Sequence, residues 1–326
     1  MKKFFYILTL VILCGCGNAT HNSDKPIITV TIEPLRYFTE AIAGEHFKVV
    51  SMVPKGSSPE SYDPTPQQLV ALGNSQAYLR IGHIGFEQAW MKKLEANHPD
   101  MKVYDTSQGI DLIRSEGHWH GDHFHEGGVE PHIWNSTQNA SMMADNIYKA
   151  LCELDSTHQE EYKHRLDSLK KTIARTDENV KAILKNASTS FLIYHPALSY
   201  FARDYGLKQI SIEEGGKEPS PAHLKELIEL CKREKIHVIF VQQEFDQRNA
   251  QLIADELGIK VVSINPLSYD WMKAGWLSIC SFSAFRNPMV RQSMFVLHSP
   301  PLAERQTLLC LFHPRDTSRT VTRYSQ

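Results

Sequence analysis

The chain has 326 residues, a formal net charge of −2 and 22% charged residues. This length is enough for two lobes of ordinary domain size. The charge is close to neutral and the sequence has no basic stripe or aromatic stacking motif, so we exclude a nucleic-acid partner.

Residues 1–15 have the pattern of a secretory signal: two lysines, then an apolar run over residues 4–13 that is too short to span a bilayer. The run ends in Leu-Cys-Gly-Cys, which resembles a bacterial lipoprotein signal with Cys16 as the lipidated residue. Residues 16–26 would then be a linker, and lipid would hold the protein on a membrane of the cell envelope, on the periplasmic side. An ordinary cleaved signal without lipid is the alternative.

Residues 27–151 alternate short β-rich runs with helical ones. The strands are expected at 27–32, 47–53, 77–81 and 102–104, and the helices at 35–43, 65–72, 86–96 and from 135 or 136 to 151. Strands that alternate with helices indicate βαβ units and a mainly parallel sheet. The pattern therefore predicts an N-terminal α/β lobe.

Residues 152–186 form the predicted link between the lobes. A helix capped by Ser156 or Thr157 is expected to run to about residue 184. At 1.5 Å per residue it would be on the order of 40 Å long, enough to cross from one lobe to another. Its apolar positions do not keep a strict heptad, which argues against a surface coiled coil.

A second alternating series occupies residues 187–275. The strands are expected at 191–194, 209–212, 238–241 and 260–264, and the helices at 197–205, 222–234 and 248–257. The predicted fold is therefore α/β, with two similar lobes whose mainly parallel sheets are joined by a long rigid helix. Ligands of open α/β sheets bind at the carboxyl ends of the strands, so the site is expected in the cleft between the lobes.

Residues 116–134 are rich in histidine. His118, His120, His123 and His125 lie in a Gly- and acid-rich loop, 116–128, and His132 follows in a Pro-His-Ile-Trp context. Neutral imidazole is a common metal ligand. The loop is either a solvated tract with adventitious metal affinity or an auxiliary segment that collects a transition metal for a fixed site that includes His132.

Polar residues of metal-binding type follow several predicted strands of both lobes. They are Glu60, His132, His195, Asn265 and Asp270, with His83 as a reserve candidate that is more simply a structural histidine. Each is a weak signal alone. Their expected convergence on one cleft predicts a metal site there.

Residues 27–271 resemble the solute-binding lipoproteins of zinc and manganese ABC importers, of the high-affinity zinc-uptake, cluster A-I type. The matching motifs are Val-Pro-Lys-Gly at 53–56, Ser-Tyr-Asp-Pro-Thr-Pro at 61–66, Gly-Phe-Glu-Gln-Ala-Trp at 85–90, Glu-Pro-His-Ile-Trp at 130–134, Tyr-His-Pro-Ala at 194–197, Tyr-Phe-Ala at 200–202, Glu-Gly-Gly-Lys-Glu-Pro-Ser-Pro at 214–221 and Asn-Pro-Leu at 265–267. The resemblance implies a monomeric receptor that captures Zn²⁺, or less readily Mn²⁺, and delivers it to an ABC permease and its ATPase.

The resemblance assigns metal ligands position by position. His132 and His195 match the family pattern outright, whereas Glu60 stands where the family usually has His and Asn265 where it usually has a carboxylate. The two departures offset each other in charge. Two histidines, one carboxylate and one more oxygen, from Asn265 or Asp270, remain a competent four-coordinate zinc site.

Two functions other than metal import are alternatives. A zinc hydrolase needs an open metal position and a general base, and no HExxH, GxSxG or P-loop pattern occurs. An envelope metal buffer or adhesin without a transporter remains an alternative. Residues 276–326, rich in Pro and Arg and without helical or strand periodicity, are expected to be poorly ordered sequence outside the family fold, for which a shifted reading frame would account.

Overall fold

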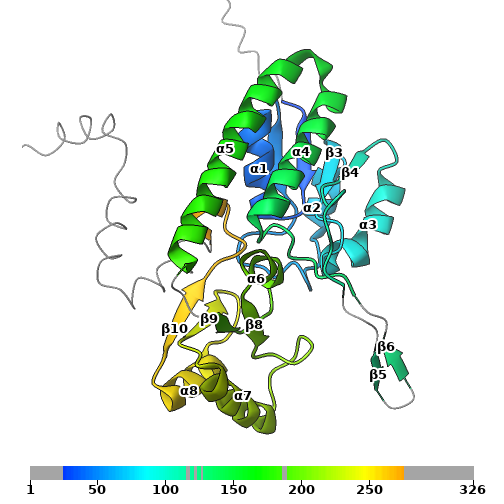
Figure 1. Ribbon diagram of the computed structural model, residues 1–326. Helices are drawn as coiled ribbons and strands as arrows, with labels where there is room; N and C mark the ends of the chain where they lie inside the picture. Colours follow the sequence, from blue (N-terminus) through cyan, green and yellow to red (C-terminus); the bar gives the residue numbers. More distant parts are fainter. Residues whose placement is uncertain (1–24, 115–117, 121–122, 126–127, 186–188, 275–326) are drawn as a thin grey trace, which may run out of the picture.

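The computed structural model describes residues 25–114, 118–120, 123–125, 128–185 and 189–274 (Figure 1). The predicted signal peptide with Cys16 and the predicted tail 276–326 lie outside these residues. Among the described helices, none combines the length and the apolar character needed to cross a membrane.

The N-terminal lobe is built on a four-stranded parallel sheet in the order β2-β1-β3-β4. Its strands are β1 (Ile27–Val30), β2 (Lys48–Ser51), β3 (Ser75–Arg80) and β4 (Lys102–Asp105). Its helices are α1 (Glu33–Ala43), α2 (Pro66–Leu72), α3 (Gly85–Asn97) and α4 (Thr137–Leu154). The central strand β1 is almost wholly buried, as expected of a parallel strand covered on both faces.

The C-terminal lobe repeats this plan with a parallel sheet in the order β10-β9-β7-β8. Its strands are β7 (Ser190–Ile193), β8 (Lys208–Ser211), β9 (Val238–Gln242) and β10 (Lys260–Ile264). Its helices are α6 (Ser199–Tyr205), α7 (Pro221–Glu234), α8 (Arg248–Leu257) and the short α9 (Trp271–Ala274). The predicted α/β fold with two similar sheets is therefore confirmed.

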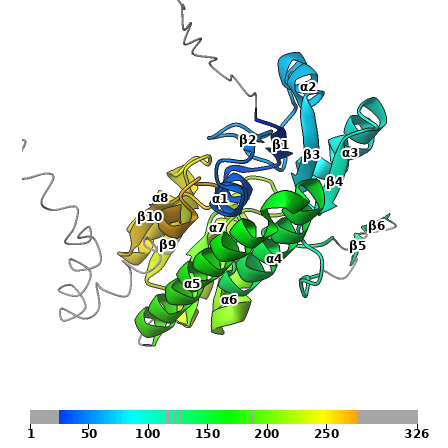
Figure 2. The same cartoon turned by 90° about the horizontal axis from the view of Figure 1, so that it is seen from above.

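The long helix α5 (Gln159–Leu184) links the lobes, as predicted, and packs along α1 and α4 (Figure 2). A short 3₁₀ turn, Ser156–His158, precedes it. Asp155 caps this turn, and its carboxylate accepts from the Thr157 N–H at 3.0 Å, whereas α5 itself starts after His158 without a side-chain cap. The expected cap at Ser156 or Thr157 is thus wrong by one or two residues. An aspartate is an equally good acceptor for free N–H groups at a helix start.

One hydrophobic core cluster spans both lobes, and a second cluster lies within the C-terminal lobe. Trp134, which follows His132, donates from Nε1 to the Pro266 carbonyl at 2.9 Å, and Trp271 Nε1 donates to the Trp134 carbonyl at 2.8 Å. Both indole rings are at most 1% exposed. These contacts join the segment before α4 to the segment after β10, so the sides of the cleft are held together at its base.

The His-rich loop contains a short antiparallel hairpin of β5 (His118–His120) and β6 (His123–His125), which extends away from the main body (Figure 1). Its register pairs His118 with His125 and His120 with His123. A bridge between Arg114 and Val129 closes the base of the excursion. The loop was predicted without strands, and the structure corrects this for six of its residues.

Candidate metal centre

Glu60 lies in the loop between β2 and α2 and is held by the start of α3. The Gly85 N–H donates to Glu60 Oε2 at 3.2 Å, and the Phe86 N–H donates to the Pro59 carbonyl at 2.9 Å. A Cβ atom at residue 85 would lie 2.3 Å from the Glu60 carbonyl oxygen, so only glycine allows this approach. Glu60 Oε1 is buried and has no hydrogen-bond partner.

His132 lies in the turn before α4 and is 6% exposed. Its Nδ1 faces the Glu130 carboxylate, which also accepts from the His132 N–H at 3.1 Å and from Ser199 Oγ at 3.0 Å. Burial raises the pKa of Glu130, but the hydrogen bonds from His132 and Ser199 lower it more, and the pKa lies below its ordinary value. An anionic Glu130 accepts the Nδ1 proton, which leaves the Nε2 lone pair of His132 free for a metal.

His195 follows β7 and comes from the other lobe. Gln242, which is fully buried, accepts from the His195 N–H at 3.3 Å and donates to the His195 carbonyl at 2.6 Å. The Nδ1 atom of His195 lies 2.8 Å from Glu213 Oε1, and Phe245 stacks on the ring. These partners fix the ring and direct Nε2 toward His132.

The three side chains converge on one point. The two Nε2 atoms of His132 and His195 are 3.2 Å apart, and Glu60 Oε1 lies 3.6 Å from His132 Nε2. One ligand atom from each residue falls within 4.8 Å of the other two. Zinc bonds of 2.0–2.1 Å at tetrahedral angles place ligand atoms about 3.3 Å apart, so the spacing suits a zinc-sized cation.

The electrostatic field at this point favours a positive charge. Burial lowers the pKa of His195, but Glu213, Glu60 and Glu130 raise it more, so that the pKa lies above its ordinary value. The partnerless oxygen of Glu60 faces the same cavity. A dication among these atoms would satisfy that oxygen and replace the proton through which the two Nε2 atoms, 3.2 Å apart, otherwise interact.

The cavity between these residues is small, about 20 Å³. It holds one water-sized particle. Its lining includes Ser58, Pro59, Trp134, Ala197, Phe245 and Leu267 beside the three ligand candidates. An ion here would be surrounded by side chains of both lobes.

The other two predicted ligands do not line this cavity. The Asn265 amide donates to Gln243 Oε1 at 3.1 Å and accepts from the Leu267 N–H at 3.1 Å, so it serves the turn after β10. Asp270 lies close enough to Tyr37 for its charge to raise the pKa of that phenol, after the larger effect of burial. The reserve candidate His83 is also absent from the cavity lining.

Glu244 lines the cavity and was missed by the sequence analysis. It follows β9 in Gln-Gln-Glu-Phe, at the carboxyl end of a central strand. Burial raises its pKa, although the neighbouring His195 and His132 partly offset this effect. Its position after a central strand could have indicated a ligand. The segment was not recognised because it leads directly into a predicted helix and contains no histidine.

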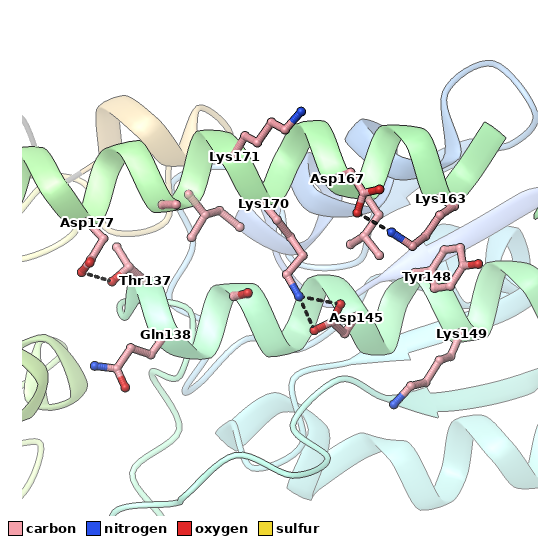
Figure 3. Close-up of a pocket in the computed structure, with 14 residues that line it drawn as sticks. Thr137, Gln138, Asp145, Tyr148, Lys149, Lys163, Asp167, Lys170, Lys171 and Asp177 are labelled. Atoms are coloured by element: carbon pink, nitrogen blue, oxygen red, sulfur yellow. Dashed lines mark hydrogen bonds and ion pairs between the residues drawn. The ribbon is translucent and has the colours of Figure 1, made fainter. Parts of the chain in front are cut away.

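A larger concavity lies elsewhere, between α4 and α5 (Figure 3). It has a volume of about 960 Å³, and its lysines and aspartates largely pair with one another, as Lys170 does with Asp145 at 2.6 Å. No histidine or cysteine lines it. We therefore assign the metal centre to the small cavity and not to this groove.

Comparison with proteins of known sequence finds relatives that are named as zinc-binding or iron-transporter lipoproteins. It is 27% identical over 287 residues to the zinc-binding lipoprotein AdcA of Streptococcus pneumoniae serotype 4, covering 82% of this chain and 56% of AdcA. The chain thus spans about half the length of AdcA. It is 29% identical over 278 residues to the iron ABC transporter substrate-binding lipoprotein MtsA of Streptococcus pyogenes serotype M1, covering 81% of this chain and 86% of MtsA.

Solved structures agree. A crystal structure of ZnuA is 35% identical and superposes with a TM-score of 0.72 over 80% of this chain and 97% of ZnuA. A manganese-bound periplasmic metal-binding protein from Candidatus Liberibacter asiaticus shares the fold, at 22% identity and a TM-score of 0.69 over 79% of this chain and all of that one. The family described as zinc-uptake complex component A, periplasmic, matches residues 28–280. The chain therefore belongs to the ZnuA family.

Proposed function

We propose that this protein is an extracytoplasmic receptor that captures Zn²⁺ and delivers it to an ABC permease and its ATPase for import. The observation that carries the proposal is the convergence of two imidazoles from different lobes with a buried, partnerless carboxylate oxygen. Membership of the ZnuA family supports the transport role. Anchoring through lipid on Cys16, the periplasmic side of the envelope and a monomeric state remain predictions.

The donor set favours zinc. Two imidazoles and a carboxylate suit Zn²⁺, and the affinity order of divalent metals places Mn²⁺ and Fe²⁺ below it. We infer that Glu244, and not Asn265 or Asp270, supplies the remaining oxygen, because Glu244 lines the cavity and the other two do not. Glu60 and Glu244 together would then balance the charge of one dication.

A zinc hydrolase is disfavoured by the same geometry. Catalytic zinc needs an open coordination position that both water and substrate can reach. A cavity of about 20 Å³ between two lobes admits an ion but not a substrate molecule. The protein is therefore proposed as a carrier without enzymatic activity.

The ligand assignment predicts that Glu60→Gln, His132→Ala and His195→Ala each weaken zinc binding by at least about 100-fold, more than the loss of a residue that only orients a ligand. The measurement is titration of the purified mature protein against a competing zinc chelator, with metal content determined in parallel. His83→Ala is the matched control and should bind zinc as the unaltered protein does. Unchanged affinity in all three ligand variants would remove the basis for the proposal.

The hairpin carries the four loop histidines, and we propose that it raises the local zinc concentration near the cleft. Deletion of residues 118–125 is expected to lower zinc stoichiometry or slow loading but to leave one tight site. Stopped-flow loading and equilibrium titration of the same preparation would show both effects. Loss of all tight binding in the deletion would contradict this division of roles.

A further inference from the structure

A second group of metal-ligating side chains lies away from the cleft, where the turn after α1 meets the connection between α4 and α5. It consists of His46, Asp155 and His158, with Glu161 beside them. We propose that this cluster, hereafter the helix-end cluster, is a second divalent-metal site, of Zn²⁺ type, which clips the turn after α1 to the start of α5.

The helix-end cluster is already assembled. The His158 Nδ1 atom lies 2.6 Å from Asp155 Oδ2, and His46 Nε2 lies 2.9 Å from Glu161 Oε2. The two imidazole rings stack with centroids 3.8 Å apart and planes inclined by 24°. One ligand atom each from His46, Asp155 and His158 falls within 4.8 Å of the others. All three residues are partly buried, so a hydrated ion can reach them.

The donor types match a borderline metal. Zn²⁺ commonly binds histidine nitrogens and carboxylate oxygens at four-coordinate geometry, and two imidazoles and one carboxylate supply three such ligands here. Glu161 or water can fill the fourth position. Without metal, each imidazole interacts with its carboxylate partner through a proton that lies between the ring nitrogen and the carboxylate oxygen. A single dication bound by both pairs replaces these protons and balances the charges of Asp155 and Glu161.

Two neighbours limit the strength of the helix-end cluster. Arg165 donates to Glu161 Oε1 at 2.7 Å, so a cation already compensates part of the carboxylate charge. The Tyr162 hydroxyl donates to Asp155 Oδ2 at 2.8 Å and occupies one of its lone pairs. We therefore expect weaker binding here than in the cleft, where the Glu60 oxygen has no partner.

The helix-end cluster is independent of the cleft. His132 precedes the first turn of α4, whereas Asp155 follows its last, and the 18 residues of α4 span about 27 Å. The proposal therefore does not rest on the import function, and each site can be removed without touching the other. A metal here would join the α1 turn to the α4–α5 connection and stabilise the N-terminal lobe.

The first test counts zinc ions on the full chain by native mass spectrometry and chelator competition. We expect His46→Gln and His158→Gln each to bind one zinc fewer per chain than the unaltered protein. His164→Gln, which removes an exposed histidine from the nearby helix α5, should bind the full number. Equal stoichiometry in all four proteins would overturn the proposal and leave a hydrogen-bonded cluster only.

The second test begins with the unaltered protein, so its first part does not depend on variants that fold. Crystals of the unaltered protein soaked in zinc should show an anomalous peak between His46 and His158 at the zinc edge, and no peak there at saturating zinc would refute the site. In the His195→Ala background, zinc should still raise the melting temperature, and adding His158→Gln should abolish that rise. If the cleft failed to bind zinc, only the import proposal would be contradicted, and the proposal for the helix-end cluster would stand.

Discussion

Glu213 acts on the cleft without facing it. It is 8% exposed and holds Nδ1 of His195 at 2.8 Å, which fixes both the tautomer and the direction of the metal-facing nitrogen. Glu130 does the same for His132. Each histidine ligand thus has its own carboxylate partner, one in each lobe.

We predict that Glu213→Gln weakens zinc binding by about 10- to 100-fold, since an amide orients the ring but polarises it less. Chelator competition on the purified protein measures the change. Glu214→Gln is the matched control, because Glu214 is exposed and adjacent in sequence but makes no contact with His195. If Glu213→Gln bound zinc as tightly as the control, the orienting role would have to be abandoned.

At the scale of elements, Glu87 ties the start of α3 to the sheet. Its carboxylate accepts from the Thr31 hydroxyl and from the N–H groups of Ile81 and Gly82, at 2.7 and 2.6 Å for the latter two. Burial raises the pKa of Glu87 to about 7, although these hydrogen bonds oppose the rise. Gly85, whose N–H donates to Glu60, lies in the same turn as Gly82. The protonation state of Glu87 therefore affects the segment that holds Glu60 in the cleft.

The raised pKa predicts a pH-dependent stability. The folded chain keeps the Glu87 proton up to about pH 7, whereas the unfolded chain releases it near its ordinary value of 4.5. This contribution is complete below pH 4.5 and is lost as pH rises through 7. Relative to Glu87→Gln, the unaltered protein should lose on the order of 2 kcal/mol between pH 5 and 8. Urea unfolding at both pH values measures this, with the exposed Glu95→Gln expected to track the unaltered protein.

The elements themselves were largely predictable from local pattern. The helix predicted at 65–72 is α2, which begins at Pro66 and has a complete capping box between Thr65 and Gln68, and Ser136, one of the two expected starts, caps α4. Strand and helix alternation was enough to give both sheets, because burial on two faces leaves a strong apolar signal. Boundaries moved by a few residues where a better cap, such as Asp155, was available.

The site was only partly predictable. His132 and His195 meet as expected, because the Pro-His-Ile-Trp context marked His132 and the position after a strand marked His195. Glu244 lines the cavity and the predicted ligand Asn265 does not. Both follow strands of the same sheet, and local sequence does not say which one faces the other lobe. That choice depends on how the lobes pack together, which is a property of the assembled core.

For the whole molecule, the indole contacts at the base of the cleft decide how firmly the lobes are joined. Trp271→Phe keeps an aromatic ring but leaves the Trp134 carbonyl without its donor, and a buried unsatisfied acceptor costs about 1–3 kcal/mol. Urea unfolding should show a loss of that size. Trp90→Phe is the control, because Trp90 donates to Asp63 at the surface and should change stability by less than about 0.5 kcal/mol. Equal losses of stability in the two variants would mean that the hydrogen bond between Trp271 and Trp134 contributes no more than the exposed one of Trp90.

A receptor of the proposed kind must also release its metal, and the position of Glu60 indicates a route. The two histidines are secured by buried partners in separate lobes that are fastened together beneath them. Glu60 instead belongs to a stretch whose residues 54–56 are open to solvent. Drawing that stretch outward would take away one of the two proposed carboxylate ligands and leave the ion held by the two imidazole rings and Glu244. The metal would then be released by movement of the loop that carries Glu60, while the two lobes keep their relative positions.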